Sequence, residues 1–290
     1  MNSRGILDFR LATDIENSEN IEKTLCAILD TLECMRGNGT SMCYADALYD
    51  QIISEREFSN WLYDFKSQPE LSTLKKELAK RIQKSSSISI EEYTCLISDV
   101  DQGVCQDELA MSVHCSTQSV LYVATPTRYW QAKQWYLSAH VNHQNFSSDI
   151  KECFPNLYFH EHVTSSLHTL NAEFSVERPH IVKHLQALND FKPQFSALST
   201  EGADHRRTCA AFQAYSHIEC SPQSDRRAAQ RLNYMFTSCT GEEIVVCCEL
   251  HTKLKWDGMD RENQDRIYFH PGRPEIADGK VLIVHIGTHQ

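Results

Sequence analysis

Three β-favouring segments near the C-terminus carry imidazole, guanidinium, ammonium and phenol groups at alternating positions. They span residues 242–254, 265–270 and 280–286. Successive side chains of a strand point to opposite faces, so the apolar positions of each segment place its polar positions together on the other face. One face of a single sheet is therefore expected to gather a set of titratable side chains. The expected set is Glu249, His251, Lys253, Arg266, Tyr268, His270 and His285, with His289 just beyond the last strand.

This set could cleave a phosphodiester without a metal ion. Imidazole is the only side chain whose ordinary pKa lies near neutrality, while lysine and arginine are cations that stabilise charge on phosphate. A histidine or glutamate would take the proton of an attacking 2′-hydroxyl, Arg266 or Lys253 would hold the phosphate oxygens, and a second histidine or Tyr268 would protonate the leaving group. A 2′-hydroxyl nucleophile confines the reaction to RNA. The alternative is an ordinary solvated face, which antiparallel sheets commonly have.

A second candidate site is a group of histidines between residues 140 and 184. His160 and His162 would share one face of a strand, and His180 and His184 one face of a helix, both workable spacings for metal ligands. No HExxH motif accompanies them, which favours hydrogen-bonded or surface histidines over a metal site. The group consists of His140, His143, His160, His162, His168, His180 and His184.

A third candidate site is acidic and precedes an apolar segment at residues 120–124. Carboxylates near strand ends hold Mg²⁺ in many nucleases. Distant acids such as Asp8 or Asp14 would have to join this group, and a solvated loop is the favoured alternative. The acids are Asp99, Asp101, Asp107 and Glu108.

Several common sites have no support in the sequence. It contains no GxxxxGK[ST], no GxGxxG after a strand and no GxSxG, so no cofactor is expected. The 12 cysteines are spread from Cys26 to Cys248 without a CxxC pair. They are expected to be reduced thiols, mostly buried as small apolar side chains, rather than a zinc site or a disulfide framework.

The elements that position these groups fall into an α+β fold of two domains. Residues 1–192 are expected to form a mainly helical domain with a small sheet. Apolar residues at helical spacing predict helices over residues 21–35, 44–52, 58–65 and 71–82. Ser89 and Glu92 have capping-box spacing for a further helix, and residues 120–124 read as a buried strand.

Residues 193–290 are expected to form a second domain with the element order β-α-α-β-β-β. A short strand over residues 194–200 and helices over 202–216 and 225–236 precede the three strands described above.

Charge is unequally divided between these parts. The net charge is −11; residues 1–199 hold 17 basic and 26 acidic side chains, and residues 200–290 hold 11 and 13. The acidic N-terminal domain is therefore expected to meet a protein partner, and RNA or the ribosome is expected at the C-terminal sheet. No apolar run is long enough for a signal peptide or a membrane span, so a cytoplasmic protein with no membrane contact is expected.

Residues 194–290 resemble the bacterial RelE/ParE-type toxin fold. The resemblance rests on the order of two helices and three strands, on the segment Arg266 to Phe269, and on a final strand that ends in Gly287, Thr288 and His289. That family includes metal-independent endoribonucleases that act on mRNA at the ribosome. The resemblance implies that Arg266 binds phosphate beside Tyr268, and that Lys253 is a basic residue of the preceding strand. It further implies that His285 or His289 is the C-terminal acid or base.

Three functions follow in order of preference. The first is a toxin-like or anti-phage defence protein whose C-terminal domain is a metal-independent endoribonuclease. The second is a non-catalytic accessory or interaction subunit of a multi-protein bacterial defence complex. The third is a metal-dependent nuclease that uses the acids near Asp99 or the histidine group.

Overall fold

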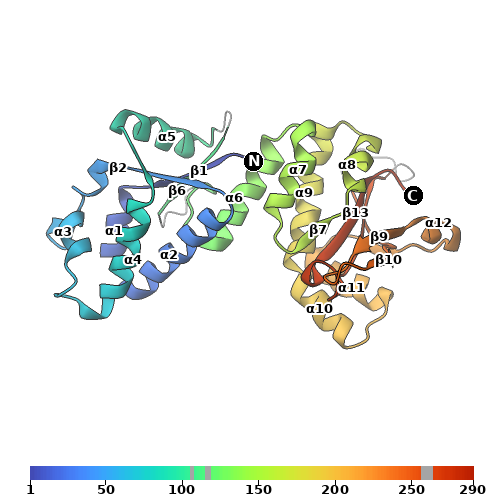
Figure 1. The fold of residues 1–290 in the computed structure, drawn as a ribbon. Coiled ribbons are helices and arrows are strands. Elements are labelled where there is room, and N and C mark those ends of the chain that lie inside the picture. The colour runs from blue at the N-terminus through green and yellow to red at the C-terminus, as the bar shows by residue number, and fades with distance from the viewer. Residues whose placement is uncertain (105–107, 115–118, 256–263) are drawn as a thin grey trace. The chain divides into compact units, whose positions relative to one another are not determined.

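The chain is an α+β protein of two compact units, Met1–Tyr136 and Leu137–Gln290 (Figure 1). The computed structural model describes residues 1–104, 108–114, 119–255 and 264–290. The sequence predicted a division between residues 192 and 193, whereas the structure divides the chain between Tyr136 and Leu137. Strand β7 (Leu157–Phe159) pairs in parallel with β13 (Val281–Gly287), and this pairing ties the middle of the chain to the C-terminal sheet.

The first unit contains a four-stranded parallel sheet in the order β5-β2-β1-β6. Figure 1 shows α5 on one side of this sheet and α1, α2 and α4 on the other. Its strands are β1 (Ser3–Leu7), β2 (Ser41–Ala45), β5 (Ser86–Ile88) and β6 (Leu109–Val113), with a small β3 (Ile52–Ile53) and β4 (Arg56–Glu57) pair. Its helices are α1 (Arg10–Glu16), α2 (Ile21–Gly37), α3 (Phe58–Tyr63), α4 (Ser72–Gln83), α5 (Ile90–Gln102) and α6 (Pro126–Ala139), which crosses into the second unit.

Local signals explain the long helices of this unit. The side chain of Asn20 caps α2 by accepting a hydrogen bond from Lys23 N at 2.9 Å, and the predicted apolar stripe of α2 is buried. Ser89 caps α5 in the same way, as its spacing predicted, and Gly103 ends α5 with a φ of +66°.

The strands of the first unit were largely missed. The stripe over residues 44–52 was predicted to be helical, but it lies in β2, a 3₁₀ turn (Asp46–Leu48) and β3. The predicted strand over residues 120–124 is a single bridge between Tyr122 and Ser112. Strand β6 is buried along its whole length, as strands of parallel sheets commonly are, so its sequence lacks the alternation that identifies half-exposed strands. Strand β5 has only three residues, which is too short for a detectable period.

The second unit contains a five-stranded mixed sheet in the order β7-β13-β12-β11-β8. One face packs on helices through Phe195 and Phe212, whose rings lie 5.7 and 6.4 Å from that of Phe269. The strands not yet given are β8 (Cys220–Pro222), β9 (Asn233–Thr237), β10 (Glu243–Cys247), β11 (Leu250–Lys253) and β12 (Arg266–His270). The helices of this unit are α7 (His143–Cys153), α8 (His162–Ser166), α9 (Phe174–Asp190), α10 (Lys192–Thr200), α11 (His205–Ser216) and α12 (Arg226–Arg231). Short 3₁₀ turns lie at Leu167–Thr169 and Ala277–Gly279 in this unit, and at Pro69–Leu71 in the first unit.

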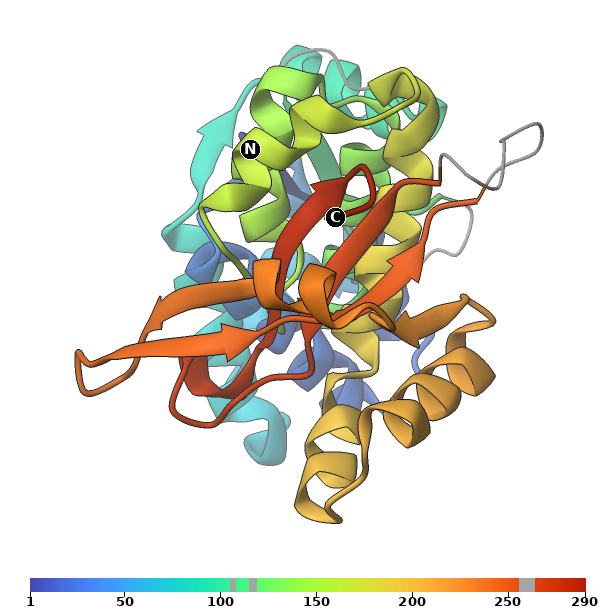
Figure 2. The same ribbon diagram turned by 90° about the vertical axis from the view of Figure 1, so that its right-hand side faces the viewer.

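The opposite face of this sheet is covered in part by a hairpin of β9 and β10. Figure 2 shows the orange hairpin crossing in front of the red and orange strands of the sheet. An apolar cluster joins the two layers. It contains Leu232, Phe236, Val246, Cys248, Tyr268, Ile276, Leu282 and Val284.

Three element predictions for the second unit were wrong. Residues 194–200 lie in helix α10 rather than a strand, with a proline in its first turn. Residues 225–236 contain the short α12 followed by β9. The segment 242–254 breaks at Cys248 and Glu249 into β10 and β11, which belong to different sheets. The order β-α-α-β-β-β is therefore not the order of this unit, whereas the helix over residues 202–216 and the strands at 265–270 and 280–286 are confirmed.

Candidate functional site

Three of the predicted site residues form a row across the C-terminal sheet. His251 on β11 is the register partner of Tyr268 on β12, which is the partner of His285 on β13. The ring of Tyr268 lies 5.1 Å from that of His251 and 5.6 Å from that of His285. Cross-strand partners share a face, so the structure brings these three side chains together from three separate strands.

A β-bulge sets which side chains of β13 join this row. Tyr268 lies opposite His285, but Phe269 lies opposite Ile283, so Val284 is an extra residue in β13. The sequence predicted strict alternation along residues 280–286, which puts Leu282 and Val284 on the face opposite His285, toward the helices. That prediction was wrong, because both residues pack in the apolar cluster with Tyr268.

The row is buried rather than solvated. The exposed fractions of His251, Tyr268 and His285 are 3%, 0% and 1%. Residues 288–290 fold over it: the backbone N–H of Gln290 donates to the Tyr268 hydroxyl at 3.2 Å, and Nε2 of His285 donates to the carbonyl oxygen of Thr288 at 2.8 Å. Neither an open catalytic face nor an ordinary solvated face therefore describes these three residues.

Three further predicted residues, Lys253, Arg266 and His289, form a more accessible rim beside the row. Lys253 is the register partner of Arg266, and it also forms an ion pair with Glu219. Arg266 donates from Nη1 to the Tyr268 hydroxyl at 3.4 Å, and its buried Nε has no hydrogen-bond partner among the described residues. His289 is exposed, and its pKa is lowered by partial burial and then by the charges of Arg266 and Lys253. The rim is thus a group of neighbouring cationic and imidazole side chains.

Burial keeps the two histidines of the row neutral at pH 7. It lowers the pKa of His285 to about 4, and it lowers the pKa of His251 to about 4 with a further contribution from Arg266. The Nδ1 of His251 lies 3.5 Å from the carbonyl oxygen of Glu249, which can only accept a hydrogen bond. Nδ1 therefore carries the proton, and Nε2 accepts from the Ser221 hydroxyl at 3.1 Å.

Sequence reasoning missed Ser221. It lies on the three-residue edge strand β8 as the register partner of His251. A strand this short, ending in a proline, has no period that a sequence pattern can detect. Its hydroxyl gives His251 a polar contact at the edge of the sheet.

Glu249 and His270 were predicted on the same face as these residues, but they lie outside the row and the rim. The strand break at Glu249 turns its carboxylate toward His205, whose Nδ1 lies 2.6 Å from Oε1. This pair lines a surface cavity of about 770 Å³ together with Arg206 and residues 222–224. Burial, and then the charge of His205, lowers the pKa of His270 to about 4, and its Nδ1 accepts a hydrogen bond from the backbone N–H of Gly272.

The histidine group is dispersed over the second unit. His184 is buried against Thr252, with its Nδ1 2.9 Å from the threonine hydroxyl, and burial lowers its pKa to about 3. His162 lies against the row instead, because its ring stacks on that of His285 with the ring centroids 5.6 Å apart. His143 and His168 contact each other, with ring centroids 4.7 Å apart. Among the described residues, no three His, Cys, Asp or Glu side chains are placed to hold a metal ion.

The acids of the third candidate site pair with different cations. Glu108 and Asp101 lie near Arg4 and Arg10, at 3.3 and 3.9 Å, while Asp99 lines a separate groove on α5. Asp107 lies outside the described residues. Each described carboxylate in this region therefore has its own neighbours, and they do not form one metal-binding group.

Asp8 lies at the carboxyl end of β1, beside the point where the strand order of the first sheet reverses. Open α/β sheets commonly bind ligands at such a point. Burial acts to raise the pKa of Asp8, but hydrogen bonds from Arg10 and Ser112, at 2.7 and 2.6 Å, outweigh it and lower the pKa. Asp8 is thus a fixed carboxylate that holds Arg10, with Asp101 beyond it.

Comparisons with protein-family models, with curated proteins and with solved structures find no match to this chain. Among the residues that the structure describes, no helix has the length and apolar composition needed to cross a bilayer.

Proposed function

We propose that the second unit is a metal-independent endoribonuclease of toxin-like or anti-phage defence type, acting in the cytoplasm on RNA, alone or at the ribosome. The observation that supports it is that Arg266 and Lys253 are register partners, with His251 two residues from Lys253 on β11. The Tyr268 hydroxyl accepts hydrogen bonds from Arg266 and from Gln290, the residue after His289. Burial, and then the charges of these two cations, act to lower the pKa values of His251 and His289. Two neighbouring cations with imidazoles beside them suit a phosphodiester better than a neutral ligand.

In this proposal the rim meets the substrate and the row supports it. Arg266 and Lys253 hold the non-bridging oxygens of the phosphate. Neutral His251 takes the proton of the 2′-hydroxyl through the Ser221 hydroxyl, which already donates to its Nε2. Protonated His289 gives a proton to the departing 5′-oxygen. Tyr268 accepts a hydrogen bond from Arg266 and another from Gln290, so it is a positioning residue that fixes the guanidinium and the segment carrying His289.

The test is cleavage of RNA by the full chain in EDTA, with and without ribosomes. An Arg266→Ala variant is expected to lose at least about a hundredfold in kcat/KM, because it removes a preorganised charge at the phosphate. Arg273→Ala is the matched control, since Arg273 is an arginine of the same unit that is paired with Glu275 instead. RNA that stays intact under all these conditions, or equal cleavage by Arg266→Ala and the wild type, would contradict the proposal.

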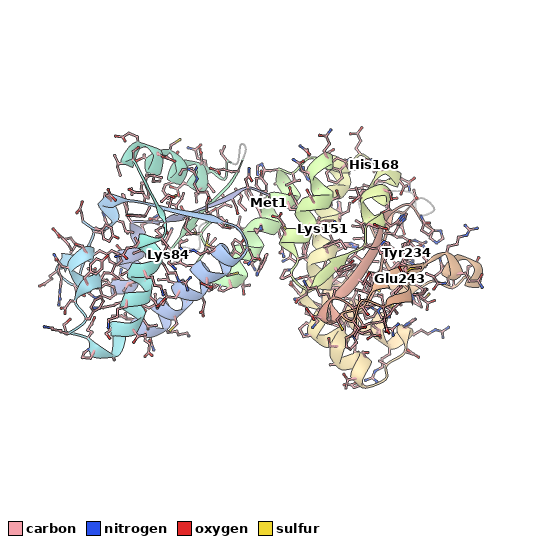
Figure 3. All side chains as sticks on the ribbon, viewed as in Figure 1. Met1, Lys84, Lys151, His168, Tyr234 and Glu243 are labelled. Carbon is pink, nitrogen blue, oxygen red and sulfur yellow. The ribbon has the colours of Figure 1, made fainter. Side chains whose placement is uncertain are left out.

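A second candidate function is that of a non-catalytic accessory subunit in a multi-protein defence complex. The observation that favours it is an apolar pair on the outer side of the β9–β10 hairpin. Met235 and Val245 are register partners with exposed fractions of 54% and 60%. Figure 3 shows Tyr234 and Glu243, which flank this pair, on the same hairpin.

These two functions are separated by two sets of substitutions. An Arg266→Ala/His285→Ala double variant that keeps wild-type function in cells would support the accessory role. In that role, Met235→Glu with Val245→Glu should remove a co-purifying protein partner, whereas the enzyme proposal predicts unchanged RNA cleavage by this hairpin variant. The acidic N-terminal part of the chain remains the proposed site for a protein partner.

A further inference from the structure

Two cysteines from different elements lie in contact inside the second unit. Sγ of Cys209 on α11 is 3.3 Å from Sγ of Cys220 on β8, and the exposed fractions of the two residues are 4% and 7%. Both are free thiols. A disulfide needs its sulfur atoms about 2 Å apart, so a shift of little more than an ångström would join them.

We propose that Cys209 and Cys220 are a redox-active dithiol, which a low-molecular-weight disulfide such as oxidised glutathione converts to an intrachain disulfide. The Cys209 thiolate attacks one sulfur of the small disulfide and releases one thiolate. The Cys220 thiolate then attacks Cys209 in the mixed disulfide and releases the second. Both cysteines are oxidised, the small disulfide is reduced to two thiols, and the two protons of the cysteines pass to the released thiolates.

The surroundings of the pair support this order of steps. The hydrogen bond from Cys220 lowers the pKa of Cys209, which favours Cys209 as the attacking thiolate. A surface cavity is lined by Glu249 and by residues 203–206 and 222–224, which are chain neighbours of Cys209 and Cys220. Glu249 is also close enough to Cys209 for its charge to act on the pKa of that thiol, so a small disulfide in this cavity would lie near the pair.

Oxidation would fix the edge strand that contacts the candidate site. Ser221, next to Cys220, donates to His251, and Gln223 lies 3.4 Å from His289 and bonds to the carbonyl oxygen of Gln290. A bond from β8 to α11 therefore restrains β8, whose Ser221 contacts His251, and with it Gln223, which follows β8 directly and contacts His289. The dithiol itself does not depend on the proposed endoribonuclease function.

The test is peptide mapping of the full chain after incubation with oxidised glutathione. The sample is quenched with acid, then unfolded and treated with N-ethylmaleimide. Cys209 and Cys220 share one tryptic peptide, residues 208–226. It is expected to be lighter by two hydrogen atoms and to carry no alkyl group. The wild type, but not Cys209→Ser or Cys220→Ser, is expected to gain several degrees in Tm on oxidation, because a cross-link restricts the unfolded chain.

Exposed Cys239 in the same unit provides the control for the oxidant. A mixed disulfide on Cys239 shows that the oxidant is active. The proposal is overturned if, at every such oxidant concentration, the 208–226 peptide carries two alkyl groups, which means that both of its cysteines stayed reduced. A peptide that carries glutathione on one cysteine and an alkyl group on the other would overturn it equally. If Cys220→Ser does not fold, the wild-type mass alone decides between these outcomes.

Discussion

Acidification from pH 7 to pH 5 is expected to destabilise the second unit through its buried histidines, and His285 offers the sharpest test. Its side chain is 1% exposed, and burial lowers its pKa from 6.5 to about 4. The unfolded chain therefore binds a proton at a higher pH than the folded chain does. The stability that neutral His285 contributes is fully present above pH 6.5 and is lost as the pH falls from 6.5 to about 4.

The size of this effect follows from the same two pKa values. Each pH unit between them costs about 1.4 kcal/mol, because the unfolded chain holds one more proton than the folded chain in this window. A fall to pH 5 covers about one and a half of these units, which gives a loss of about 2 kcal/mol from His285 alone. Because the His285 side chain is only 1% exposed, solvent screens its electrostatic interactions very little.

The measurement compares wild type with His285→Gln, which keeps a donor near the carbonyl oxygen of Thr288. The free energy of opening of β13 is obtained at pH 7 and pH 5 from backbone hydrogen exchange, corrected for the intrinsic exchange rate at each pH. The difference between the two pH values is expected to be smaller in the variant by about 2 kcal/mol. His168→Gln, at a position that Figure 3 places at the periphery of the unit, is the control and should behave as wild type.

Equal pH dependence in His285→Gln and the wild type would refute the burial argument. It would mean that His285 binds its proton as readily in the folded chain as in the unfolded chain. Residues 288–290 would then not cover the row as the hydrogen bonds to Tyr268 and His285 indicate. The burial argument would also be refuted if the variant were less stable than the wild type at both pH values but lost the same free energy of opening between pH 7 and pH 5.

Three further predictions concern packing and activity. Gly287→Ala should destabilise the second unit by about 1–3 kcal/mol in urea unfolding, because a Cβ there would lie 2.6 Å from the carbonyl oxygen of Ser166. Phe212→Ala should cost about 3–5 kcal/mol in the same assay, since its ring is fully buried between helices and sheet. In the proposed RNA cleavage, kcat/KM should increase as the pH rises through about 4, where His251 loses its proton. It should decrease again starting at a pH lower than 6.5, the ordinary pKa of histidine, because the lowered pKa of His289 makes this residue lose its proton early. A pH optimum at or above 7 would contradict this assignment of base and acid.

The elements that the sequence predicted well have strong local signals. Helix α2 has a capping asparagine and a long apolar stripe, and β12 and β13 are compact runs of β-favouring residues. Helix α10 was misread because Phe195 and its neighbours alternate loosely, while a proline in the first turn and packing on Phe269 decide for a helix. Tertiary contacts overrode the local pattern there.

For the candidate site, the sequence predicted the convergence of side chains but not their environment. Period two placed His251 and Tyr268 on one face, and the register of the strands agrees. The bulge at Val284 and the fold of residues 288–290 over Tyr268 depend on contacts between distant segments, and no local pattern specifies them. Burial of the row therefore had no signal that a single sequence could supply.

Because the row is buried and the rim is accessible, substitutions in the row and in the rim are expected to have different effects. His285 lies beneath residues 288–290, so its replacement should alter stability and its pH dependence before it alters any reaction. Arg266 is partly exposed, and its buried Nε has no hydrogen-bond partner within the described part of the chain, so its replacement should alter phosphate binding before it alters stability. If Arg266→Ala proves as stable as the wild type and fails to cleave RNA, the rim is the reacting surface. If it is instead unstable with cleavage preserved, Arg266 is part of a structural polar core and the reacting groups lie elsewhere. The accessory role is the better account if the wild type also leaves RNA intact.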